Sequence, residues 1–557
     1  MTKTRNLINL LLKSCICQFF FVNLRSIYCV RTNVCVCTHA KVCKYKMKIL
    51  DCTLRDGGYY TNWDFESPLV DTYLAAVNQL PIDYIEVGYR NLPQEEYMGE
   101  YGYCPVSTLQ HIRNQCSKKI AVMLNEKSTK VGDLEQLLSP IDELVDMVRV
   151  AVDPKNFDRA VGLAKAVKER YDIEVAFNVM YMSTWEDGFF EKLHQLNGVA
   201  DLFCMVDSYG SITPQEAKAV TERIKKEQQC QVGFHGHNNL QLGLINTLTA
   251  IESGVDFVDG TIRGMGRGAG NLNTELLLTY LNKHQDLKVD FNVLGDVVSA
   301  FEPLQQQYQW GTSLPYMLSG ANSIPQKDVM EWVQNRIYSF NSIVRALDNR
   351  KSHKDDNAKY PVLNVDKRYR NVLIVGGGET VIRHITAIKT FVEMHDAALV
   401  FATARFAGLF EDVECPKYYC LLGNESKRLS SNIDTGKEFK GTCVMPPYPR
   451  KMGTDVPKHV QDKTFELPQI SFIGKYLDSC TTLAVELAQM LKAADGNLYV
   501  VGYDGYHGHV LTEKELTLNR ENEEIFETYA AWSNGKIISL LPTMYKALDV
   551  TSLYNLL

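Results

Sequence analysis

The chain has 557 residues, a formal net charge of -7, and hydrophobic and charged fractions of 45% and 22%. These fractions are typical of a soluble globular protein, and the length exceeds what one core usually holds, so we expect two or three domains. A pI near 6.0, without a local stripe of Lys and Arg in the folded part, argues against nucleic acid as a partner.

Residues 1–46 differ in composition from the rest of the chain. They contain no Asp or Glu, six of the fifteen cysteines, and an apolar stretch at 8–24 that Lys13 interrupts. Three interpretations are open: a translated upstream segment with Met47 as the working start, a targeting peptide, or a membrane anchor. We favour the first, a non-globular extension, because strand-like sequence begins directly at Met47. The remaining cysteines are scattered singly, which indicates reduced thiols and a cytoplasmic protein without membrane contact of its folded part.

Short apolar runs alternate with amphipathic stretches from Met47 onward. The stretches at 67–79, 156–170, 213–226 and 240–253 carry apolar residues three and four apart, as helices do. Eight repeats in about 240 residues favour an α/β fold of the (β/α)8 TIM-barrel type over a doubly wound sheet. The eight apolar runs that we expect to be its strands are 48–53, 84–88, 120–124, 147–152, 174–180, 202–207, 231–235 and 257–262.

The pattern changes after the eighth repeat. We therefore expect the barrel at 47–285, a helical segment at 286–350, and a polar linker at 351–367 that contains Pro361. Alternating runs resume after the linker and continue to the end of the chain. A second, Rossmann-like α/β domain is predicted over 368–557.

Active sites of TIM barrels lie at the carboxyl ends of the strands, so the polar residues that follow each run are the candidates. His235 and His237 end the seventh run, and residues two apart on a strand point to the same side. Asp56 ends the first run, two places away in a closed barrel. This set can bind one divalent metal and leave positions open for water and substrate, although the histidines could instead be solvated or satisfied in the core.

Further candidates lie beside this predicted metal site. Arg55 could stabilise negative charge on an enolate oxygen or form an ordinary ion pair at the rim. Glu86, at the end of the second run, is a candidate substrate contact. The glycine-rich segment 264–271 could bind phosphate through its N–H groups or form a tight turn that needs positive φ angles. Its last residue, Asn271, could reach the metal or cap the next helix.

Three motifs carry a resemblance to a known family. They are Asp-Cys-Thr-Leu-Arg-Asp-Gly-Gly at 51–58, His-Gly-His-Asn-Asn-Leu-Gln-Leu-Gly at 235–243 and Gly-Met-Gly-Arg-Gly-Ala-Gly-Asn at 264–271. In this order they resemble the DRE-TIM metallolyases, which include hydroxymethylglutaryl-CoA lyase, isopropylmalate synthase and 4-hydroxy-2-oxovalerate aldolase. The second and third motifs are most similar to those of the aldolases, since the acetyl-CoA-dependent synthases more often have Asn-Asp after the second histidine.

The resemblance implies roles for individual residues. It implies that Asp56, His235 and His237 bind Mn²⁺ or Mg²⁺, with Asn271 as a ligand or close neighbour, that Arg55 stabilises a pyruvate enolate, and that Ser208 touches substrate. The aldolases have a histidine base four positions after the arginine, where this chain has Tyr59. An ordinary tyrosine, with a pKa near 10, is a poor base at neutral pH. Either the metal site activates Tyr59, or water is the base, or the reaction differs.

We therefore predict a carbon–carbon lyase, a metal-dependent aldolase that cleaves or forms a bond of a 4-hydroxy-2-oxo acid. The alternatives are a Claisen-type synthase that joins an acyl-CoA to a 2-oxo acid, and a non-catalytic metal-binding scaffold for the C-terminal domain. A homo-oligomer is expected. The segment 310–320 also resembles relatives of these aldolases, whose post-barrel helices contact an aldehyde-consuming dehydrogenase, so such a partner is a further prediction.

The C-terminal domain resembles another group. The runs 497–506 and 541–545, with a helix at 481–492, are similar to Rossmann-like domains of 6-hydroxymethylpterin diphosphokinase-like proteins and some bacterial sialyltransferases. Those domains bind nucleotides at a glycine-rich first turn, which here would be residues 376–378. Because Gly-Gly-Gly-Glu-Thr differs from Gly-x-Gly-x-x-Gly, no cofactor-binding residue is assigned. A scaffold or oligomerisation role is the alternative.

Overall fold

The structure is a computed structural model that describes residues 47–334, 340–354, 357–433, 438–450, 456–506 and 513–557. The predictions for residues 1–46 lie outside this part of the chain. Among the described residues, every helix is too short or too polar to cross a membrane. The described cysteines are all free thiols, as their scattered positions predicted.

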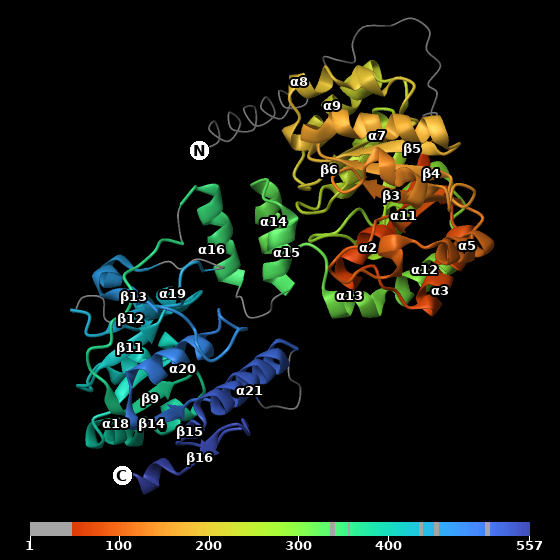
Figure 1. The fold of residues 1–557 in the computed structure, drawn as a ribbon. Coiled ribbons are helices and arrows are strands. Elements are labelled where there is room, and N and C mark those ends of the chain that lie inside the picture. Colours follow the sequence, from red (N-terminus) through yellow and green to blue (C-terminus); the bar gives the residue numbers. More distant parts are fainter. Residues whose placement is uncertain (1–46, 335–339, 355–356, 434–437, 451–455, 507–512) are drawn as a thin grey trace, which may run out of the picture. The chain divides into compact units, whose positions relative to one another are not determined.

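Eight parallel strands close into a barrel in which β1 pairs with β2 and with β8 (Figure 1). The predicted TIM barrel is therefore confirmed. Each strand overlaps the run predicted for it, with ends that differ by at most two residues. The strands are β1 (Lys48–Asp51), β2 (Tyr84–Tyr89), β3 (Lys119–Asn125), β4 (Met147–Val152), β5 (Glu174–Val179), β6 (Leu202–Asp207), β7 (Gln231–Gly236) and β8 (Phe257–Gly260).

The strands are apolar because both of their faces are buried, as in other all-parallel sheets. One face packs against the surrounding helices in the largest hydrophobic cluster. The other face contributes a separate cluster that includes Leu50, Met147 and Phe257 and fills one layer of the lumen. The lumen is therefore packed with side chains.

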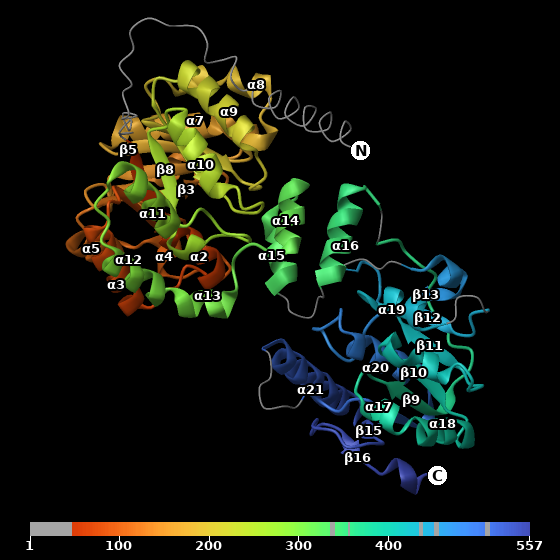
Figure 2. The same cartoon turned by 180° about the vertical axis from the view of Figure 1, so that it is seen from behind.

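Helices follow the strands around the outside of the barrel (Figure 2). Thr213 begins one of them with a capping box to Glu216, which explains the sharp start of that helix. The barrel helices of at least five residues are α2 (Thr53–Thr61), α3 (Ser67–Gln79), α5 (Val106–Gln115), α6 (Leu134–Leu138), α7 (Phe157–Arg170), α9 (Pro214–Glu227), α10 (Gly243–Glu252) and α11 (Thr274–Gln285).

The structure corrects one element boundary. The first run ends at Asp51, so Arg55 and Asp56 lie in α2 and not at the end of a strand. The cause is the buried Asp51 carboxylate, which accepts hydrogen bonds from the backbone N–H of Thr53 (3.0 Å) and from its hydroxyl (2.6 Å). These bonds turn the chain into a helix directly after β1.

Helices continue beyond the barrel, in agreement with the helical segment predicted for 286–350. Among them α14, α15 and α16 pack against one another. The exact domain boundaries stay predictions. The helices are α12 (Phe291–Ala300), α13 (Glu302–Tyr308), α14 (Leu314–Ala321), α15 (Gln326–Gln334) and α16 (Phe340–Lys351).

A second parallel sheet follows, as predicted, with the order β13-β12-β11-β10-β9-β14-β15-β16. Separate hydrophobic clusters cover its two faces, one with α20 and α21 and the other with α18. The strands are β9 (Tyr369–Val375), β10 (Ala398–Phe401), β11 (Lys417–Cys420), β12 (Thr442–Met445), β13 (Thr464–Glu466), β14 (Lys492–Val501), β15 (Ile538–Ser539) and β16 (Asp549–Val550), and the helices are α17 (Thr380–Arg383), α18 (Ile385–Met394), α19 (Glu425–Asn432), α20 (Cys480–Leu491) and α21 (Glu513–Ser533).

Substitution of Gly88, in β2, tests how closely this strand packs against its neighbours. A Cβ atom there would lie 1.9 Å from the Tyr101 carbonyl oxygen, whereas a Cβ at Gly162 in α7 would meet nothing within 4 Å. We expect Gly88→Ala to destabilise the barrel by about 1–3 kcal/mol or more, and Gly162→Ala to stabilise it by about 0.5–1 kcal/mol. Urea unfolding followed by circular dichroism measures both. Equal midpoints for the two variants would contradict this packing.

Candidate active site

The predicted metal-ligand side chains come together at the mouth of the barrel. The rings of His235 and His237 have centroids 4.9 Å apart. His235 Nε2 lies 3.5 Å from Asp56 Oδ2, and the Asn271 side-chain amide donates to the same carboxylate oxygen at 2.6 Å. All four side chains are buried. The structure thus gathers these residues, while their role as ligands stays a prediction.

Each histidine is oriented by a partner on its other ring nitrogen. Nδ1 of His235 lies 2.9 Å from Asp259 Oδ2, and Nδ1 of His237 lies 2.9 Å from the Asp207 main-chain oxygen. If both acceptors receive a proton from Nδ1, each Nε2 is the unprotonated nitrogen that a metal requires. Asp259 was not singled out from the sequence, because it lies inside an apolar run.

The protonation states of His237 and Asp56 also favour the binding of a cation. Burial, followed by the neighbouring His235, lowers the pKa of His237 to about 3, so this ring is neutral at neutral pH. Burial alone would raise the pKa of Asp56, but the Arg55 guanidinium, together with the nearby histidines and Arg267, outweighs this effect and lowers the pKa to about 2. Ligands must be deprotonated in this way to bind metal. The Asn271 Oδ1 atom is buried without a hydrogen-bond partner among the described residues, an oxygen of the kind Mn²⁺ and Mg²⁺ prefer.

Cys52 belongs to the same group, and the sequence analysis did not select it. Ligand atoms of Cys52, Asp56 and His235 all lie within 4.8 Å of one another, which makes these residues a possible metal-binding triad. Burial raises the pKa of the Cys52 thiol well above its usual range. A neutral thiol is a weak ligand for hard cations, so we assign Cys52 to the packing of the site.

Arg55 is held rigidly beside this group. Its guanidinium is ion-paired with Asp56, and its Nε donates to Glu86 Oε2 at 2.9 Å. Glu86 is fully buried, and the same oxygen accepts from Arg149 Nη1 at 3.1 Å. This placement makes Glu86 a residue that positions Arg55, and its predicted contact with substrate stays a prediction.

Arg149 links the carboxylate that holds Arg55 to the carboxylate that holds His235. It is fully buried in the lumen, where it binds Glu86 on one side and Asp259 Oδ2, at 2.5 Å, on the other. Asp259 in turn holds His235. The only sequence signal for Arg149 is a charged residue within the apolar run Met-Val-Arg-Val-Ala-Val.

Tyr59, which replaces the aldolase histidine, lies in an aromatic and cationic cluster. Its hydroxyl is 2.8 Å from the hydroxyl of Tyr89, at the end of β2, and the Arg267 guanidinium lies 4.3 Å from its ring centroid. Burial raises the pKa of the Tyr89 phenol well above its usual range. Tyr89 lies one residue past the predicted run and was missed.

The other predicted residues surround the same mouth. Ser208 follows β6, and its hydroxyl accepts from the Tyr181 backbone N–H at 2.9 Å. Within the segment 264–271, Gly264, Gly268 and Gly270 have positive φ angles, which supports the tight-turn interpretation.

Comparison with known proteins agrees with this geometry. Residues 46–299 match the family model described as HMGL-like. A 4-hydroxy-2-oxovalerate aldolase of Chloroflexus aurantiacus is 34% identical over 246 residues, 42% of this chain and 69% of the relative. One from Moorella thermoacetica is 30% identical over 285 residues, 49% of this chain and 82% of the relative. The crystal structure of the N-terminal domain of a candidate aldolase from Bacteroides vulgatus is 64% identical, with a TM-score of 0.52, and covers 54% of this chain and 100% of that one.

The fold, the site and these relatives together define the class of protein. The barrel is that of a carbon–carbon lyase, as predicted from the sequence. The chain belongs to the HMGL-like family, the DRE-TIM metallolyases, and within it resembles the 4-hydroxy-2-oxovalerate aldolases.

The contact between Asp259 and His235 gives a test of the site that does not depend on turnover. We expect Asp259→Asn to weaken Mn²⁺ binding by about 10–100-fold, because the histidine loses its charged acceptor. Electron paramagnetic resonance of free Mn²⁺ during a titration measures the affinity. Asp158→Asn is the control, since Asp158 forms only an exposed ion pair with Lys192 and a bond to Gln195. Equal affinity of the two variants would rule out this role of Asp259.

Proposed function

We propose that this protein is a divalent-metal-dependent aldolase that cleaves or forms the C3–C4 bond of a 4-hydroxy-2-oxo acid through a pyruvate enolate. The observation that carries the proposal is the buried Arg55, fixed between Asp56 and Glu86 beside the two histidines. The names of the aldolase relatives support the same reaction.

Asp56, His235 and His237 would hold the metal, with Asn271 as a fourth ligand or close neighbour. When bound, a divalent cation supplies positive charge that polarises the keto group of the substrate. The carboxylate and amide oxygens suit Mn²⁺ or Mg²⁺, the metals that the family resemblance implies. The neutral state of His237 and the ionised state of Asp56 mean that neither ligand has to lose a proton at neutral pH.

In the cleavage direction, a base takes the proton of the C4 hydroxyl and the C3–C4 bond breaks. The aldehyde leaves, the electron pair stays on the pyruvate fragment as an enolate, and protonation of C3 yields pyruvate. Arg55 stabilises the negative charge that develops on the enolate oxygen. Because Glu86 and Asp56 fix its guanidinium in advance, Arg55 needs little reorganisation during the reaction. Ser208, beside Tyr181, is the proposed further contact with the substrate.

We assign the base role to Tyr59. The Tyr89 hydroxyl lies 2.8 Å from the Tyr59 hydroxyl, and the Arg267 guanidinium lies 4.3 Å from the centre of the Tyr59 ring, so a hydrogen-bond partner and a positive charge flank this phenol. Self-association and an aldehyde-consuming dehydrogenase partner stay predictions from the family resemblance.

The proposed reaction predicts a metal-dependent product. Purified protein with Mn²⁺ should release pyruvate from 4-hydroxy-2-oxo acids, and EDTA should abolish the release until Mn²⁺ is restored. Coupled lactate dehydrogenase measures pyruvate across a series of chain lengths. Release of free thiol from acetyl-CoA with a 2-oxo acid, without pyruvate formation, would favour the Claisen-type synthase. If metal binds and neither product forms, the barrel is a scaffold.

The roles of Arg55 and Tyr59 predict separate losses. We expect Arg55→Ala to lower kcat by about 10²–10³-fold through lost enolate stabilisation, and Tyr59→Phe to lower it by about 10²–10⁴-fold through the lost base. Tyr280→Phe is the matched control, because Tyr280 lies on the exposed side of α11. Steady-state rates at saturating Mn²⁺ measure all three. Full turnover of Tyr59→Phe would transfer the base role to water.

A further inference from the structure

A guanidinium at the mouth of the barrel has no acceptor among the described residues. Arg55 and Arg149 each form two ion pairs with buried carboxylates. Arg267, in the loop after β8, instead packs on the ring of Tyr59, and no hydrogen bond or ion pair joins its guanidinium to the described part of the chain. A guanidinium carries five N–H donors in a planar fork. The donors of Arg267 are therefore available to a ligand.

These donors are open to the mouth of the barrel. Arg267 is half-buried, and none of its nitrogens is among the buried polar atoms that lack a partner in the described residues. Its charge also reaches the proposed metal site. Burial raises the pKa of Asp56, while Arg55, the two histidines and Arg267, in that order, lower it. Arg267 thus lies close to the candidate ligands without being paired with them.

The loop backbone on both sides of this side chain is fixed by the fold. The Arg267 carbonyl accepts from the Gly270 N–H at 3.0 Å, and the Gly268 carbonyl accepts from the buried Tyr60 hydroxyl at 3.1 Å. Gly268 has a φ of 63°, and a Cβ atom there would lie 2.5 Å from Gln326 Oε1. Because this backbone is already ordered, an anion that binds Arg267 does not have to order it.

Arg267 lies where the proposed reaction places the aldehyde end of the substrate. Arg55 and the metal would hold the 2-oxo acid end, and Tyr59 would take the proton of the C4 hydroxyl. The part of the substrate beyond C4 then lies next to Tyr59, whose ring centroid is 4.3 Å from the Arg267 guanidinium carbon. Trp63, with its ring centroid 4.9 Å from that of Tyr59, adds an aromatic neighbour. Arg267 supplies the positive charge beside this end of the substrate.

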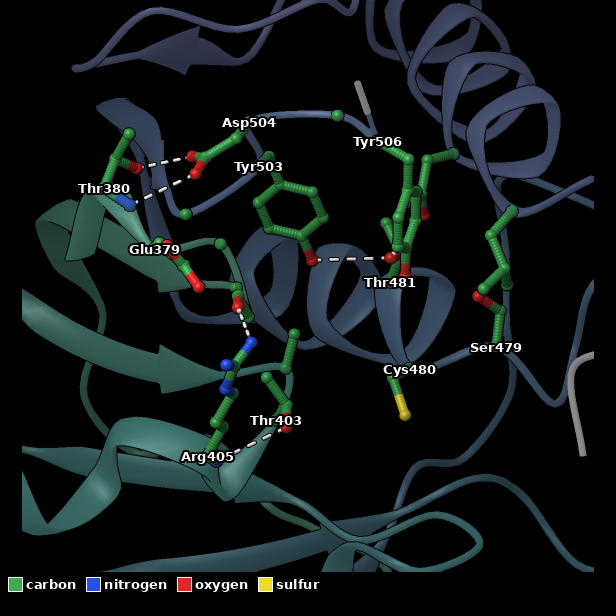
Figure 3. A pocket seen from close by; sticks show the side chains of 18 of the residues that line it. Glu379, Thr380, Thr403, Arg405, Ser479, Cys480, Thr481, Tyr503, Asp504 and Tyr506 are labelled. Carbon is green, nitrogen blue, oxygen red and sulfur yellow. Dashed lines mark hydrogen bonds between the residues drawn. The ribbon is translucent and has the colours of Figure 1, made fainter. Parts of the chain in front are cut away.

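The cavity of the second domain is less suited to an anion. It measures about 1330 Å³ and lies at the carboxyl ends of β9 and β14. Arg405 lines it, and Nη1 of this residue donates to the Gly377 carbonyl at 2.8 Å (Figure 3). Arg428, also in the lining, has its Nη1 2.6 Å from Glu425 Oε1, and carboxylates outnumber guanidinium groups around the cavity. The unpaired guanidinium of Arg267 therefore offers the better anion site.

We propose that Arg267 selects substrates whose aldehyde fragment carries an anionic group, a carboxylate or a phosphate, and binds that group through its guanidinium. The substrate class is then a 4-hydroxy-2-oxo acid with a second acidic group at the far end of its chain. Both kinds of anion present paired oxygens to the planar fork of an arginine. This inference rests on the proposed aldolase function and specifies its substrate.

Binding of unreactive analogues tests the assignment independently of turnover. A 2-oxo acid without a 4-hydroxyl group cannot be cleaved by the proposed reaction. Calorimetry of the full-length protein with Mn²⁺ compares 2-oxoglutarate, 2-oxoadipate, 2-oxopimelate and the corresponding terminal phosphonates with the monoacids of equal length. We expect at least one doubly acidic analogue to bind about tenfold or more tightly than its monoacid, and Arg267→Gln to remove this preference.

Condensation of pyruvate with aldehydes distinguishes the two anions. Succinic semialdehyde carries a carboxylate, and its methyl ester is the neutral counterpart. Glyceraldehyde 3-phosphate carries a phosphate and is compared with glyceraldehyde. We expect kcat/KM for at least one anionic aldehyde to exceed that of its counterpart by about 10–100-fold, mainly through KM, and Arg267→Gln to abolish this ratio.

Two further variants serve as references. Arg267→Lys should keep part of the preference, because lysine keeps the charge but loses the planar fork. Arg170→Gln should keep all of it, since Arg170 is exposed at the C-terminal end of α7, on the side of the barrel away from the mouth. Circular dichroism spectra that match the wild type show that each variant is folded.

The outcomes separate this inference from the aldolase proposal. Equal binding of doubly acidic analogues and monoacids at every length, or a preference that survives Arg267→Gln, would overturn the role of Arg267. Equal slowing of charged and neutral aldehydes by Arg267→Gln would also contradict it, because the arginine would then act through Tyr59. If no aldehyde condenses but the analogue preference depends on Arg267, the aldolase proposal fails and the anion site stands.

Discussion

The site depends on charges that are buried together in the lumen of the barrel. Arg149, without solvent exposure, lies between Glu86 and Asp259, and these carboxylates hold Arg55 and His235 respectively. Moving such charges out of water costs several kcal/mol each, and the cost is offset only when every partner is in place. The guanidinium and the imidazole are therefore fixed relative to each other before any substrate or metal binds. This arrangement suits a reaction in which negative charge develops at one fixed point.

Most of the barrel could be predicted from the sequence, because a parallel strand that is buried on both faces has an almost uninterrupted run of apolar residues. The predictions that were wrong or missing have identifiable structural causes. Asp56 was expected at a strand end, but the hydrogen bonds from Thr53 to Asp51 start a helix there. Arg149 and Asp259 were missed because each lies singly in an apolar run, and pairing between them requires the closed barrel. The four candidate ligands were found because their motifs follow strands that meet at one mouth.

The second domain shows a different limit of sequence analysis. Its alternating runs predicted an α/β fold, which the parallel sheet confirms, yet the glycines at 376–378 alone did not define a ligand site. The cavity forms because β14 returns to pair with β9, which brings Asp504 and the start of α20 to that loop. Strand order of this kind is set by tertiary packing over more than a hundred residues, and no local pattern encodes it.

The proposed metal site beside Arg55 is the central claim. Crystals soaked with Mn²⁺ and oxalate, a mimic of the pyruvate enolate, test it most directly through the anomalous signal of the metal. The account predicts one Mn²⁺ bound by Asp56, His235 and His237, with oxalate on the metal and within hydrogen-bond distance of Arg55. A metal bound elsewhere, or oxalate away from Arg55, would contradict it.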